Sequence, residues 1–406
     1  MQIAVLGYGV VGSGVVELIT KNKKIISKNA GTDVDIKYIL DIRDFSDSPF
    51  CDKFTKDFNV ILNDPGIATV VEVMGGTDPS FRFVKGLLEK HKNVVTSNKE
   101  LVAQHGAELL KTAFDNNVNF LFEAAVGGGI PIIRPLHQCL AANEISSICG
   151  ILNGTTNYIL TKMLVEKLPF ETALKQAQDK GYAERNPEAD VMGYDTLRKI
   201  CILASLAYGK HIYPDNILTE GISNIKISDV KIAHSAGYTV KLLGVAKKHS
   251  NDKIYIITAP FLIPFNSPLA NVEDVFNAIL VKGSFVDDVA FYGRGAGKYP
   301  TASAVAADVI DTAKHLHARK WLYWEDSDNS SVADYKDEFV KMMIRLKSDS
   351  LNELIKTVET LFGNVIRLEV AEKNEFAFLT PELAERDIDS RLSKTSGKII
   401  SKIRVL

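Results

Sequence analysis

The residues Gly7-Tyr8-Gly9-Val10-Val11-Gly12 stand between an apolar run at 3–6 and a helical pattern at 12–24. The first glycine permits a tight turn, the second lets the backbone approach a pyrophosphate, and the third allows the helix to pack closely on the strand. The N-terminus of the helix would stabilise the phosphate charge. Because strand, glycines and helix occur in the required order, the stretch predicts a dinucleotide-binding loop; a tight turn without a ligand is the alternative.

Outward from this loop, the first 130 residues alternate short β-rich runs with segments of helix length. Strand-like runs occur at 34–40, 70–73, 93–96 and 119–122, and a clear helical segment lies at 79–90. Strands separated by helical patterns argue for a parallel, doubly wound sheet with right-handed crossovers. We therefore predict an α/β fold with a Rossmann domain over residues 1–130.

The rest of the chain predicts two further domains. Residues 131–324 mix helical and strand-like segments, which is typical of an α+β domain. A polar stretch at 325–331 has the composition of a linker. Residues 335–406 then show a β-α-β-β-α-β pattern, the split βαβ arrangement of small ferredoxin-like modules. Its segments lie at 339–346, 351–361, 365–370, 376–379, 382–394 and 400–405.

The composition is that of an ordinary globular protein. Of 406 residues, 46% are hydrophobic and 24% charged, enough for a large core. The net charge of −2 gives no electrostatic footprint for nucleic acid or an anionic membrane. No run of roughly eighteen apolar residues occurs and the chain opens directly into a strand, so we expect neither a membrane span nor a signal peptide. The 4 cysteines lack CxxC spacing, which favours reduced thiols in a cytoplasmic protein over structural zinc.

The end of the second strand bears on the choice of dinucleotide. An acidic residue there would accept hydrogen bonds from the ribose hydroxyls and favour NAD, whereas an arginine would pair with a 2′-phosphate and favour NADP. The sequence has both, Asp41 and Arg43. The expected cofactor is therefore NADP or NAD, and Arg43 is either a phosphate contact or an ordinary loop charge.

Two lysines are candidate catalytic residues. Lys99 follows a strand at the edge where such sheets bind ligands, and is alternatively a surface residue that opens a helix. Lys199 begins a stretch that is hydrophobic on every face to Ala207, so its ammonium group is expected to be buried. Burial costs on the order of several kcal/mol unless the charge is paired or used. The alternative is an Asp195–Lys199 helical ion pair worth about 0.3–0.5 kcal/mol.

A carboxylate-rich segment precedes Lys199. Its acids between positions 184 and 195 are Glu184, Glu188, Asp190 and Asp195. Charge runs in loops are usually solvated, but these acids lie close in sequence to a lysine expected to be buried. The cluster suggests a site for a cationic amine. Metal binding is the alternative, although no histidine is present.

The segment 123–131 closes the first domain with Glu123 and three consecutive glycines at 127–129. Such a backbone exposes carbonyl oxygens, and one carboxylate beside them suits a hard monovalent or divalent cation. A flexible interdomain hinge is the alternative. The loops 153–157 and 293–297 also contain glycines that let the backbone approach a ligand.

Taken together, these motifs resemble the homoserine dehydrogenase family. The similar stretches are 7–14, 75–76, 97–102, 123–131, 151–159, 181–184, 188–191, 195–199 and 295–303, in the family's order. The resemblance implies an NAD(P)-dependent oxidoreductase that interconverts L-homoserine and L-aspartate 4-semialdehyde in threonine, methionine and isoleucine biosynthesis. It also implies that the middle domain serves catalysis and dimerisation in a homo-oligomer, a dimer or tetramer.

The resemblance further implies roles for single residues. Lys199 is similar to the proton donor and acceptor, with Lys99 assisting near the nicotinamide. The substrate carboxylates would be Glu184 and Asp195, with Asp190 close by. The cofactor contacts would be Gly7, Gly9, Val10, Val11, Gly12, Arg43, Lys99, Gly181 and Gly297. The family's sodium site would be formed by Glu123 and the carbonyl groups of Val126, Gly128 and Ile130.

General chemistry agrees with these roles. The nicotinamide carries the hydride, so the protein has to move one proton onto or off the alcohol oxygen. A desolvated lysine gives up its proton more readily and can exchange it near neutrality. Carboxylates around it can hold the substrate ammonium at a fixed distance from the hydride.

The last domain resembles the regulatory ACT module, which binds an amino-acid effector such as threonine. The Asp-x-Pro-Gly turn that usually follows the first strand of this module is absent. Lys347-Ser348-Asp349-Ser350-Leu351 stands in its place. Feedback control and a purely structural role are therefore both open.

Two other functions fit parts of the sequence. A semialdehyde dehydrogenase shares the cofactor fold but needs a cysteine thiolate activated by a histidine or a helix N-terminus. Cys149 lies in an apolar strand without a nearby histidine, which favours a core cysteine. A non-catalytic, nucleotide-dependent amino-acid sensor is the second alternative, and cofactor binding without turnover of any amino alcohol would support it.

Overall fold

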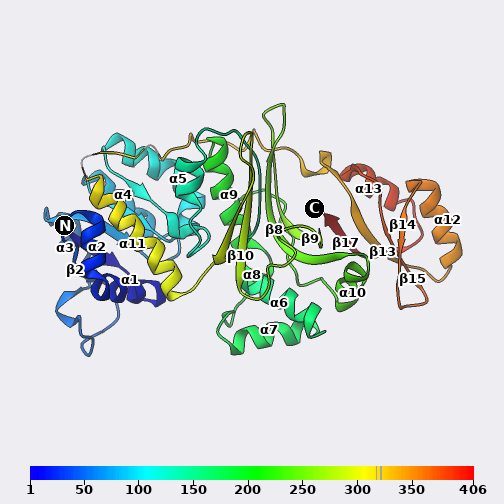
Figure 1. The fold of residues 1–406 in the computed structure, drawn as a ribbon, viewed down its shortest axis with the longest axis horizontal. Helices are drawn as coiled ribbons and strands as arrows, with labels where there is room; N and C mark the ends of the chain where they lie inside the picture. The colour runs from blue at the N-terminus through cyan, green and yellow to red at the C-terminus, as the bar shows by residue number, and fades with distance from the viewer. Residues whose placement is uncertain (317, 321) are drawn as a thin grey trace. The chain divides into compact units, whose positions relative to one another are not determined.

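The structure, a computed structural model, describes residues 1–316, 318–320 and 322–406. The chain divides into two compact units (Figure 1). Each unit combines segments that lie far apart in the sequence. Unit 1 contains Met1–Ile145, Cys201–Asp215 and Gly283–Asn329, and unit 2 contains Ser146–Ile200, Asn216–Lys282 and Ser330–Leu406.

A six-stranded parallel sheet forms the centre of unit 1. Its strands are β1 (Gln2–Leu6), β2 (Asp35–Leu40), β3 (Phe54–Thr55), β4 (Ile67–Glu72), β5 (Asn93–Thr96) and β6 (Phe120–Leu121). They lie in the order β3-β2-β1-β4-β5-β6, with every neighbouring pair parallel. Ile3, Val5, Val70 and Val71 have no exposed surface. Such apolar central strands require cover on both faces of the sheet.

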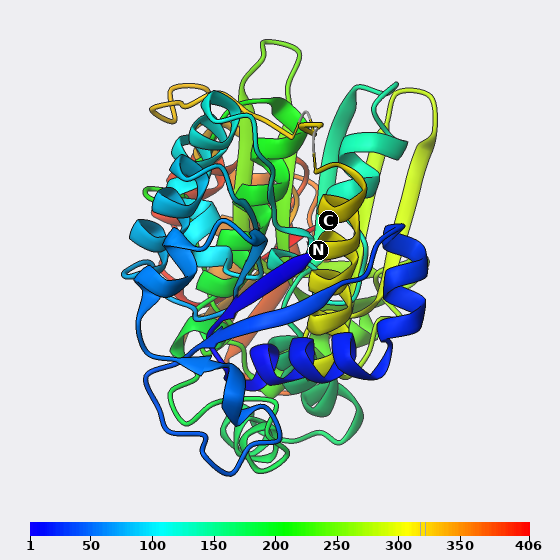
Figure 2. The same cartoon turned by 90° about the vertical axis from the view of Figure 1, so that its left-hand side faces the viewer.

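Helices provide this cover on both sides of the sheet (Figure 2). One face carries α1 (Val10–Lys21), α2 (Lys23–Ala30) and α11 (Lys298–Lys314), and the other carries α3 (Phe58–Asn63), α4 (Ser80–Glu89) and α5 (Lys99–Asp115). Helix α11 comes from much later in the chain and packs against α1. Gly14 permits this approach, because a Cβ atom there would lie 2.8 Å from Cγ of Lys298. The predicted doubly wound α/β fold is confirmed.

The remaining elements of unit 1 are short. They are η1 (Cys51–Lys53), η2 (Glu123–Ala125), the π-type turn η3 (Pro135–Cys139) and β11 (Asp287–Arg294). Helix α9 (Tyr194–Tyr208) begins in unit 2 and ends in unit 1. Within the described residues, no helix is both long and apolar enough to cross a membrane.

Unit 2 is built on a mixed sheet. Its strands are β7 (Ile145–Ile151), β8 (Tyr238–Lys248), β9 (Ile254–Pro264), β10 (Phe276–Gly283), β13 (Met342–Lys347), β14 (Ile366–Leu368), β15 (Glu375–Leu379) and β17 (Lys398–Val405). Their order is β10-β7-β8-β9-β17-β13-β15-β14. Strands β7, β8 and β9 pair antiparallel, and so do β17, β13, β15 and β14. The parallel pair β9–β17 joins these two halves.

Helices α6 (Gly154–Val165), α7 (Phe170–Asp179), α8 (Glu188–Val191) and α10 (Ile227–Ser235) belong to unit 2 together with the first part of α9. A buried cluster unites Ile159 and Met163 of α6, Leu262 of β9 and Ile403 of β17. The last strand of the chain thus shares a core with the helices that carry the candidate site. The middle of α6 is therefore packed into this core.

The C-terminal part of unit 2 has the predicted β-α-β-β-α-β order, with α12 (Leu351–Phe362) and α13 (Glu385–Leu392) as its helices. Most boundaries shift by one or two residues, and at two places an additional short strand alters the predicted elements. The strand predicted at 339–346 is interrupted at Lys341, because β12 (Phe339–Val340) pairs with β16 (Leu383–Ala384) whereas β13 pairs with β15 and β17. The helix predicted from 382 begins only at Glu385, because residues 383 and 384 form β16.

Buried ion pairs tie this C-terminal part to the rest of unit 2. Arg404 of β17 is 2% exposed, and its guanidinium nitrogens lie 2.6 Å from Oε1 of Glu385 and 2.7 Å from Oε2 of Glu220. Arg345 of β13 pairs in the same way with Asp229 of α10 and Glu375 of β15. Neither arginine is an ordinary solvent-facing charge of an edge strand. Removing one partner of such a pair leaves a buried charge uncompensated.

Candidate active site

The dinucleotide loop between β1 and α1 has the geometry that its glycines predict. Gly7 has a φ of 97°, a value that favours glycine. A Cβ atom at Gly12 would lie 2.0 Å from the carbonyl oxygen of Gly7. Helix α1 has no side-chain cap at Gly9. Its first two residues are Val10 and Val11, and Val10 is 69% exposed. Backbone N–H groups at an uncapped helix N-terminus bind phosphate, so this loop fits a pyrophosphate.

A cleft of about 380 Å³ adjoins the loop. Residues that follow β1, β2 and β4 line it, at the carboxyl ends of the strands where open α/β sheets bind their ligands. This volume lies within the usual range of pockets that bind small organic ligands. The lining includes Gly7, Tyr8, Gly9, Asp41, Ile42, Arg43, Lys56, Val73 and Met74.

Asp41 and Arg43 form an ion pair in the wall of this cleft. Nε and Nη2 of Arg43 lie 3.0 and 2.9 Å from the two carboxylate oxygens of Asp41. The carboxylate also accepts the backbone N–H groups of Tyr8 and Arg43. These donors, the Arg43 side chain first, lower the pKa of Asp41 to about 2. Asp41, the acid expected to accept hydrogen bonds from a ribose, therefore already accepts four hydrogen bonds within the protein. Two of these hold the Arg43 side chain beside it.

Lys56 is a further cation on the cleft wall, and no motif in the sequence marks it. It follows β3, and the pairing of β3 with β2 brings it to the cleft. Three aromatic rings lie nearby, those of Tyr8, Phe45 and Phe54, with ring centres 4.8 to 5.0 Å apart. The Arg43 guanidinium carbon lies 5.1 Å from the centre of the Phe45 ring. The cleft therefore combines positive charge with apolar surface.

Lys99 is the first residue of α5 and is half-buried, at the same edge of the sheet as the dinucleotide loop. Asn98 fixes this position. Its Oδ1 accepts the N–H group of Leu101 at 3.1 Å, and its Nδ2 donates to the carbonyl oxygen of Gly76 at 2.6 Å. Lys99 therefore combines both interpretations of the sequence. It is the first residue of a helix, and it lies at the edge of the sheet where such folds bind ligands.

Gly297 lies at the N-terminus of α11, which also lacks a side-chain cap. Its φ of 122° favours glycine. Glu17 of α1 accepts hydrogen bonds from Nζ of Lys298 at 2.6 Å and from the hydroxyl of Tyr299 at 2.9 Å. The start of α11 is therefore held against α1, the helix that follows the dinucleotide loop.

Lys199 is buried, as its apolar helix predicts, with 7% of its surface exposed. Its Nζ atom lies 2.7 Å from Oδ2 of Asp195, one turn earlier in α9, and 2.8 Å from the carbonyl oxygen of Leu152. The two interpretations of this lysine are therefore compatible, since it is both buried and paired. The third ammonium hydrogen has no acceptor among the described residues.

Asn153 connects the predicted acids Asp190 and Asp195. Its Nδ2 donates to Oδ1 of Asp190 at 2.7 Å and to Oδ2 of Asp195 at 2.8 Å. Its Oδ1 accepts the N–H group of Thr156 at 2.8 Å, so Asn153 is the N-cap of α6. The sequence places this residue only in a glycine-containing loop. An Asn followed by Gly-Thr-Thr is compatible with an N-cap, but nothing local indicates the two acids.

Glu184 and Gly181 lie in the loop between α7 and α8. Gly181 is exposed and has a φ of 73°. The hydroxyl of Thr155 donates to the carbonyl oxygen of Tyr182 at 2.6 Å, which anchors the loop to the start of α6. The Glu184 carboxylate is exposed and makes no hydrogen bond or ion pair with the described residues. The structure thus brings Asp190, Asp195 and Lys199 together and leaves Glu184 facing solvent.

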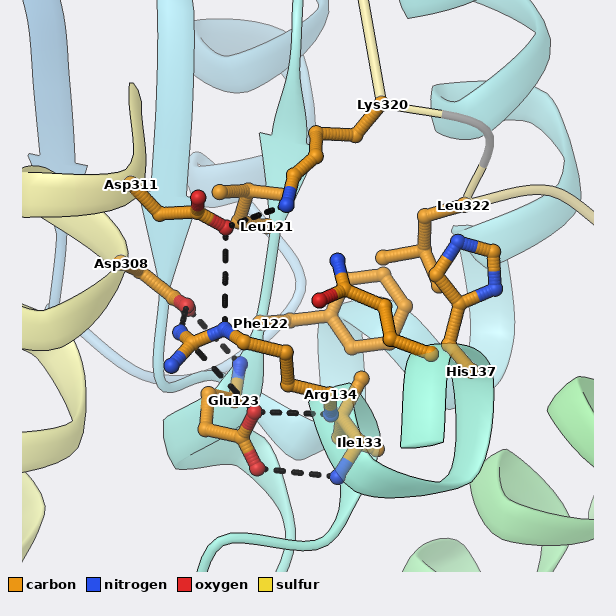
Figure 3. Close-up of a pocket in the computed structure, with 11 residues that line it drawn as sticks. Leu121, Phe122, Glu123, Ile133, Arg134, His137, Asp308, Asp311, Lys320 and Leu322 are labelled. Carbon is orange, nitrogen blue, oxygen red and sulfur yellow. Dashed lines mark hydrogen bonds and ion pairs between the residues drawn. The ribbon is translucent and has the colours of Figure 1, made fainter. Parts of the chain in front are cut away.

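Glu123 is buried, and its carboxylate caps the segment that follows (Figure 3). Oε1 accepts the N–H groups of Ile132 and Ile133 at 2.7 and 2.9 Å, and Oε2 accepts that of Arg134 at 2.8 Å. The backbone N–H of Glu123 donates to Asp308, whose carboxylate pairs with Arg134. Burial raises the pKa of Asp308 to about 7, although Arg134 acts in the opposite direction. Three of the lone pairs on Glu123 are therefore in use.

The carbonyl groups predicted to share a cation with Glu123 lie in a buried turn. The carbonyl oxygens of Val126, Gly128 and Ile130 receive no hydrogen bond from the described residues. A Cβ atom at Gly128 would lie 2.4 Å from the carbonyl oxygen of Gly295, so this glycine also permits a close packing of two loops. Among the side chains that the structure describes, no group of three or more His, Cys, Asp or Glu forms a metal site. Unpaired buried carbonyl oxygens suit a cation that binds to backbone oxygen.

Cys149 lacks the properties of a nucleophile. Burial raises the pKa of its thiol to about 12. A thiol of this kind stays protonated at neutral pH, whereas catalytic cysteines are thiolates. The structure therefore argues against Cys149 as the nucleophile of a semialdehyde dehydrogenase.

Hydride chemistry needs a nicotinamide carrier and a group that exchanges the accompanying proton. Unit 1 fits the dinucleotide, and the buried, paired ammonium of Lys199 in unit 2 is a candidate for the group that exchanges the proton. These features define the class of the protein as an NAD(P)-dependent oxidoreductase.

Comparison with known proteins identifies the family. The profile described as "Homoserine dehydrogenase" matches residues 131–310, and that of "Homoserine dehydrogenase, NAD binding domain" matches residues 7–123. The chain is 34% identical to the homoserine dehydrogenase of Bacillus subtilis over 421 residues, 100% of this chain and 97% of that protein. It is 44% identical to that of Helicobacter pylori over 316 residues, 77% and 74% of the two proteins. The chain belongs to the homoserine dehydrogenase family.

Solved structures agree with this assignment. A homoserine dehydrogenase from Thiobacillus denitrificans superposes with a TM-score of 0.91 at 32% identity, covering 100% of this chain and 98% of that one. A hyperthermophilic archaeal homoserine dehydrogenase mutant in complex with NADPH superposes with a TM-score of 0.66 at 27% identity, covering 76% and 96%.

Proposed function

We propose that this chain catalyses the NAD(P)-linked interconversion of L-homoserine and L-aspartate 4-semialdehyde, with Lys199 exchanging the proton of the alcohol oxygen. The bound nicotinamide would supply or accept the hydride. The observation that carries the proposal is the burial of the Lys199 ammonium beside Asp195 at 2.7 Å. Two of its hydrogens are used within the protein, and the third remains for the substrate oxygen.

We further propose that carboxylates bind the substrate ammonium. The exposed, unpaired carboxylate of Glu184 is a ready partner for an arriving ammonium ion, and Asp190 and Asp195 add negative charge in the same unit. Lys99, at the ligand edge of unit 1, is assigned to the nicotinamide end of the cofactor. Gly181 and Gly297 are assigned to backbone contacts with the dinucleotide, since neither presents a side chain.

For the cofactor we propose that NADP and NAD both bind, with NADP favoured. Arg43 and Lys56 give the cleft two cations. Asp41 already has four donors, which weakens its ability to accept from the ribose of NAD. A 2′-phosphate can compete with Asp41 for the exposed Arg43 guanidinium.

We propose a sodium site formed by Glu123 and the carbonyl groups of Val126, Gly128 and Ile130. The donor set is all oxygen and carries one formal charge, which suits a hard monovalent cation. The support is the set of buried carbonyl oxygens without donors. The Glu123 carboxylate contributes chiefly by orienting the turn, because three backbone N–H groups already bind it.

We propose that residues 335–406 are an ACT-like module whose main role here is structural. Its strand order β17-β13-β15-β14 is that of a ferredoxin-like fold, and two buried arginines join it to the catalytic part of unit 2. Threonine should therefore leave turnover unchanged, and inhibition by threonine would instead identify an effector site.

We also propose a cytoplasmic homo-oligomer, a dimer or tetramer. The free state of all 4 cysteines suits a reducing compartment.

The activity is tested by nicotinamide absorbance with L-homoserine and each oxidised cofactor in turn. Absorbance should rise with L-homoserine, more quickly with NADP than with NAD, and should stay flat with D-homoserine. Cofactor binding without turnover of L-homoserine would favour the nucleotide-dependent sensor and refute the proposal.

A further inference from the structure

One side chain holds the acid–lysine cluster at the end of a helix. Asn153 is 5% exposed, and the two hydrogens of its amide go to two different carboxylates. Asp190 belongs to α8 and Asp195 to α9, whereas Asn153 caps α6. A single amide therefore sets the distance between two acids that come from separate helices.

The orientation of this amide is fixed by its own contacts. Oδ1 accepts the N–H group of Thr156, and Nδ2 faces both carboxylates. Turning the amide over would direct its oxygen at two anionic groups and its NH₂ group at another N–H donor. Only one orientation of the amide satisfies all three partners, so Oδ1 and Nδ2 of Asn153 cannot exchange places.

The same contacts close a ring around Lys199. The carbonyl oxygen of Leu152 accepts from Nζ, Nζ donates to Oδ2 of Asp195, and this oxygen also accepts from Nδ2 of Asn153. Leu152 and Asn153 are neighbours in the chain, so the ring closes on one dipeptide. The ring directs two of the three ammonium hydrogens and thereby fixes the direction of the third.

We propose that Asn153 is a positioning residue for the dehydrogenase reaction. It holds Asp195, and through Asp195 the Lys199 ammonium, in the direction that proton exchange with the substrate oxygen requires. This inference rests on the proposed function of Lys199. A serine or aspartate at this position would still cap α6, because Ser, Asp and Asn are comparable N-caps, but would not supply two N–H donors. Capping and positioning can therefore be separated.

The experiment compares Asn153→Ser and Asn153→Asp with the wild-type enzyme. Both variants should keep the circular dichroism and the dinucleotide affinity of the wild type. We expect kcat for L-homoserine to fall by about tenfold to a hundredfold, the range that misplacement of a reacting group by about 1 Å produces. The KM for the dinucleotide should change less than about twofold, since the cofactor loop is not touched.

The pH profile provides a readout that a capping role would not alter. Asn153→Asp brings a third carboxylate against Asp190 and Asp195, and neighbouring carboxylates hold a proton to higher pH. The acidic limb of the kcat profile should therefore move to higher pH in Asn153→Asp. It should stay near its wild-type position in Asn153→Ser, in which only the donors are lost.

A control comes from a second N-cap, which caps its helix through a carboxylate oxygen. Asp57 caps α3 by accepting the N–H group of Asn59 at 2.9 Å and is exposed. Asp57→Ser should leave kcat and its pH profile unchanged. Wild-type kcat and pH profile in both Asn153 variants would overturn the proposal, and so would failure of both to fold, because either result reduces Asn153 to a structural cap. Absence of turnover in the wild type would instead refute the proposed function.

Discussion

Arg43 lies with its guanidinium group against the carboxylate of Asp41, with Nη2 2.9 Å from Oδ2. The acid that favours NAD and the base that favours NADP are thus bound to each other in the wall of the cleft. We predict that the choice between the two dinucleotides depends on which ligand group separates this pair. The sequence leaves that choice undecided because both residues are present.

Replacing Asp41 by Asn should shift the preference toward NADP. The variant loses the charge that holds Arg43 and that repels a 2′-phosphate, so the Kd for NADPH should fall by roughly tenfold, equivalent to about 1.4 kcal/mol. The Kd for NADH should rise or stay the same. Arg43→Ala is the opposing control and should weaken NADPH more than NADH. Fluorescence titration with both reduced cofactors measures the four changes, and equal effects on NADPH and NADH would exclude this pair as the selector.

Replacing Lys199 by Ala or Arg should abolish most turnover while the fold and cofactor binding persist. Arginine keeps the charge but does not release its proton, so both variants should lose about 10²- to 10⁴-fold in kcat, the usual contribution of proton transfer. Lys241→Met is the matched control. Lys241 is a lysine of the same unit with 3% exposure, and its Nζ donates to Asn157 and to the carbonyl of Val272 rather than to an acid. This control should retain turnover, whereas near-normal turnover in Lys199→Ala would remove Lys199 from the mechanism.

Lys241 also makes stability depend on pH. Burial lowers its pKa from 10.5 to about 8. Between these values the unfolded chain binds more protons than the folded one, so the contribution of Lys241 to stability rises with pH from about 8 to 10.5. The free energy of unfolding of the wild type, relative to Lys241→Met, should therefore rise by up to about 3 kcal/mol across this window. Urea unfolding of both proteins at the two ends measures it. A constant difference would contradict the burial of a neutral amine in this range.

Exchange of sodium for choline should lower thermal stability and turnover together. The carbonyl oxygens of Val126, Gly128 and Ile130 would lose the cation proposed to satisfy them, and choline is too large to replace it. A ligand that binds only the folded state stabilises it in proportion to the logarithm of its concentration. The midpoint of thermal unfolding should follow sodium in this way at constant ionic strength. Identical midpoints in both salts would refute the cation site.

Local patterns predicted the parts of the site that depend on one element. The glycines at 7–12 predicted the dinucleotide loop because each has a local structural role. They permit a tight turn, a close approach of the backbone to a pyrophosphate, and close packing of the helix on the strand. The apolar faces of α9 predicted the burial of Lys199, and the (i, i+4) spacing predicted its pairing with Asp195. These features need no knowledge of the rest of the fold.

The parts that depend on several elements could not be predicted in this way. The contacts of Asn153 with two acids require α6, α8 and α9 to meet, and Lys56 reaches the cleft only because β3 pairs with β2. Arg404 lies in a short alternating strand at the end of the sequence, where a charged residue usually faces solvent. It is buried because β17 pairs with β9, a contact between residues 404 and 261 that no local pattern encodes.

The position of β17 has a consequence for biosynthesis. This strand lies inside the sheet of unit 2, between β9 and β13, yet it is translated after every other strand of that sheet. While the nascent chain lacks β17, the largely apolar strand β9 keeps an open edge that invites wrong pairing. We therefore expect wrong pairing at this edge to compete with folding until β17 has been translated.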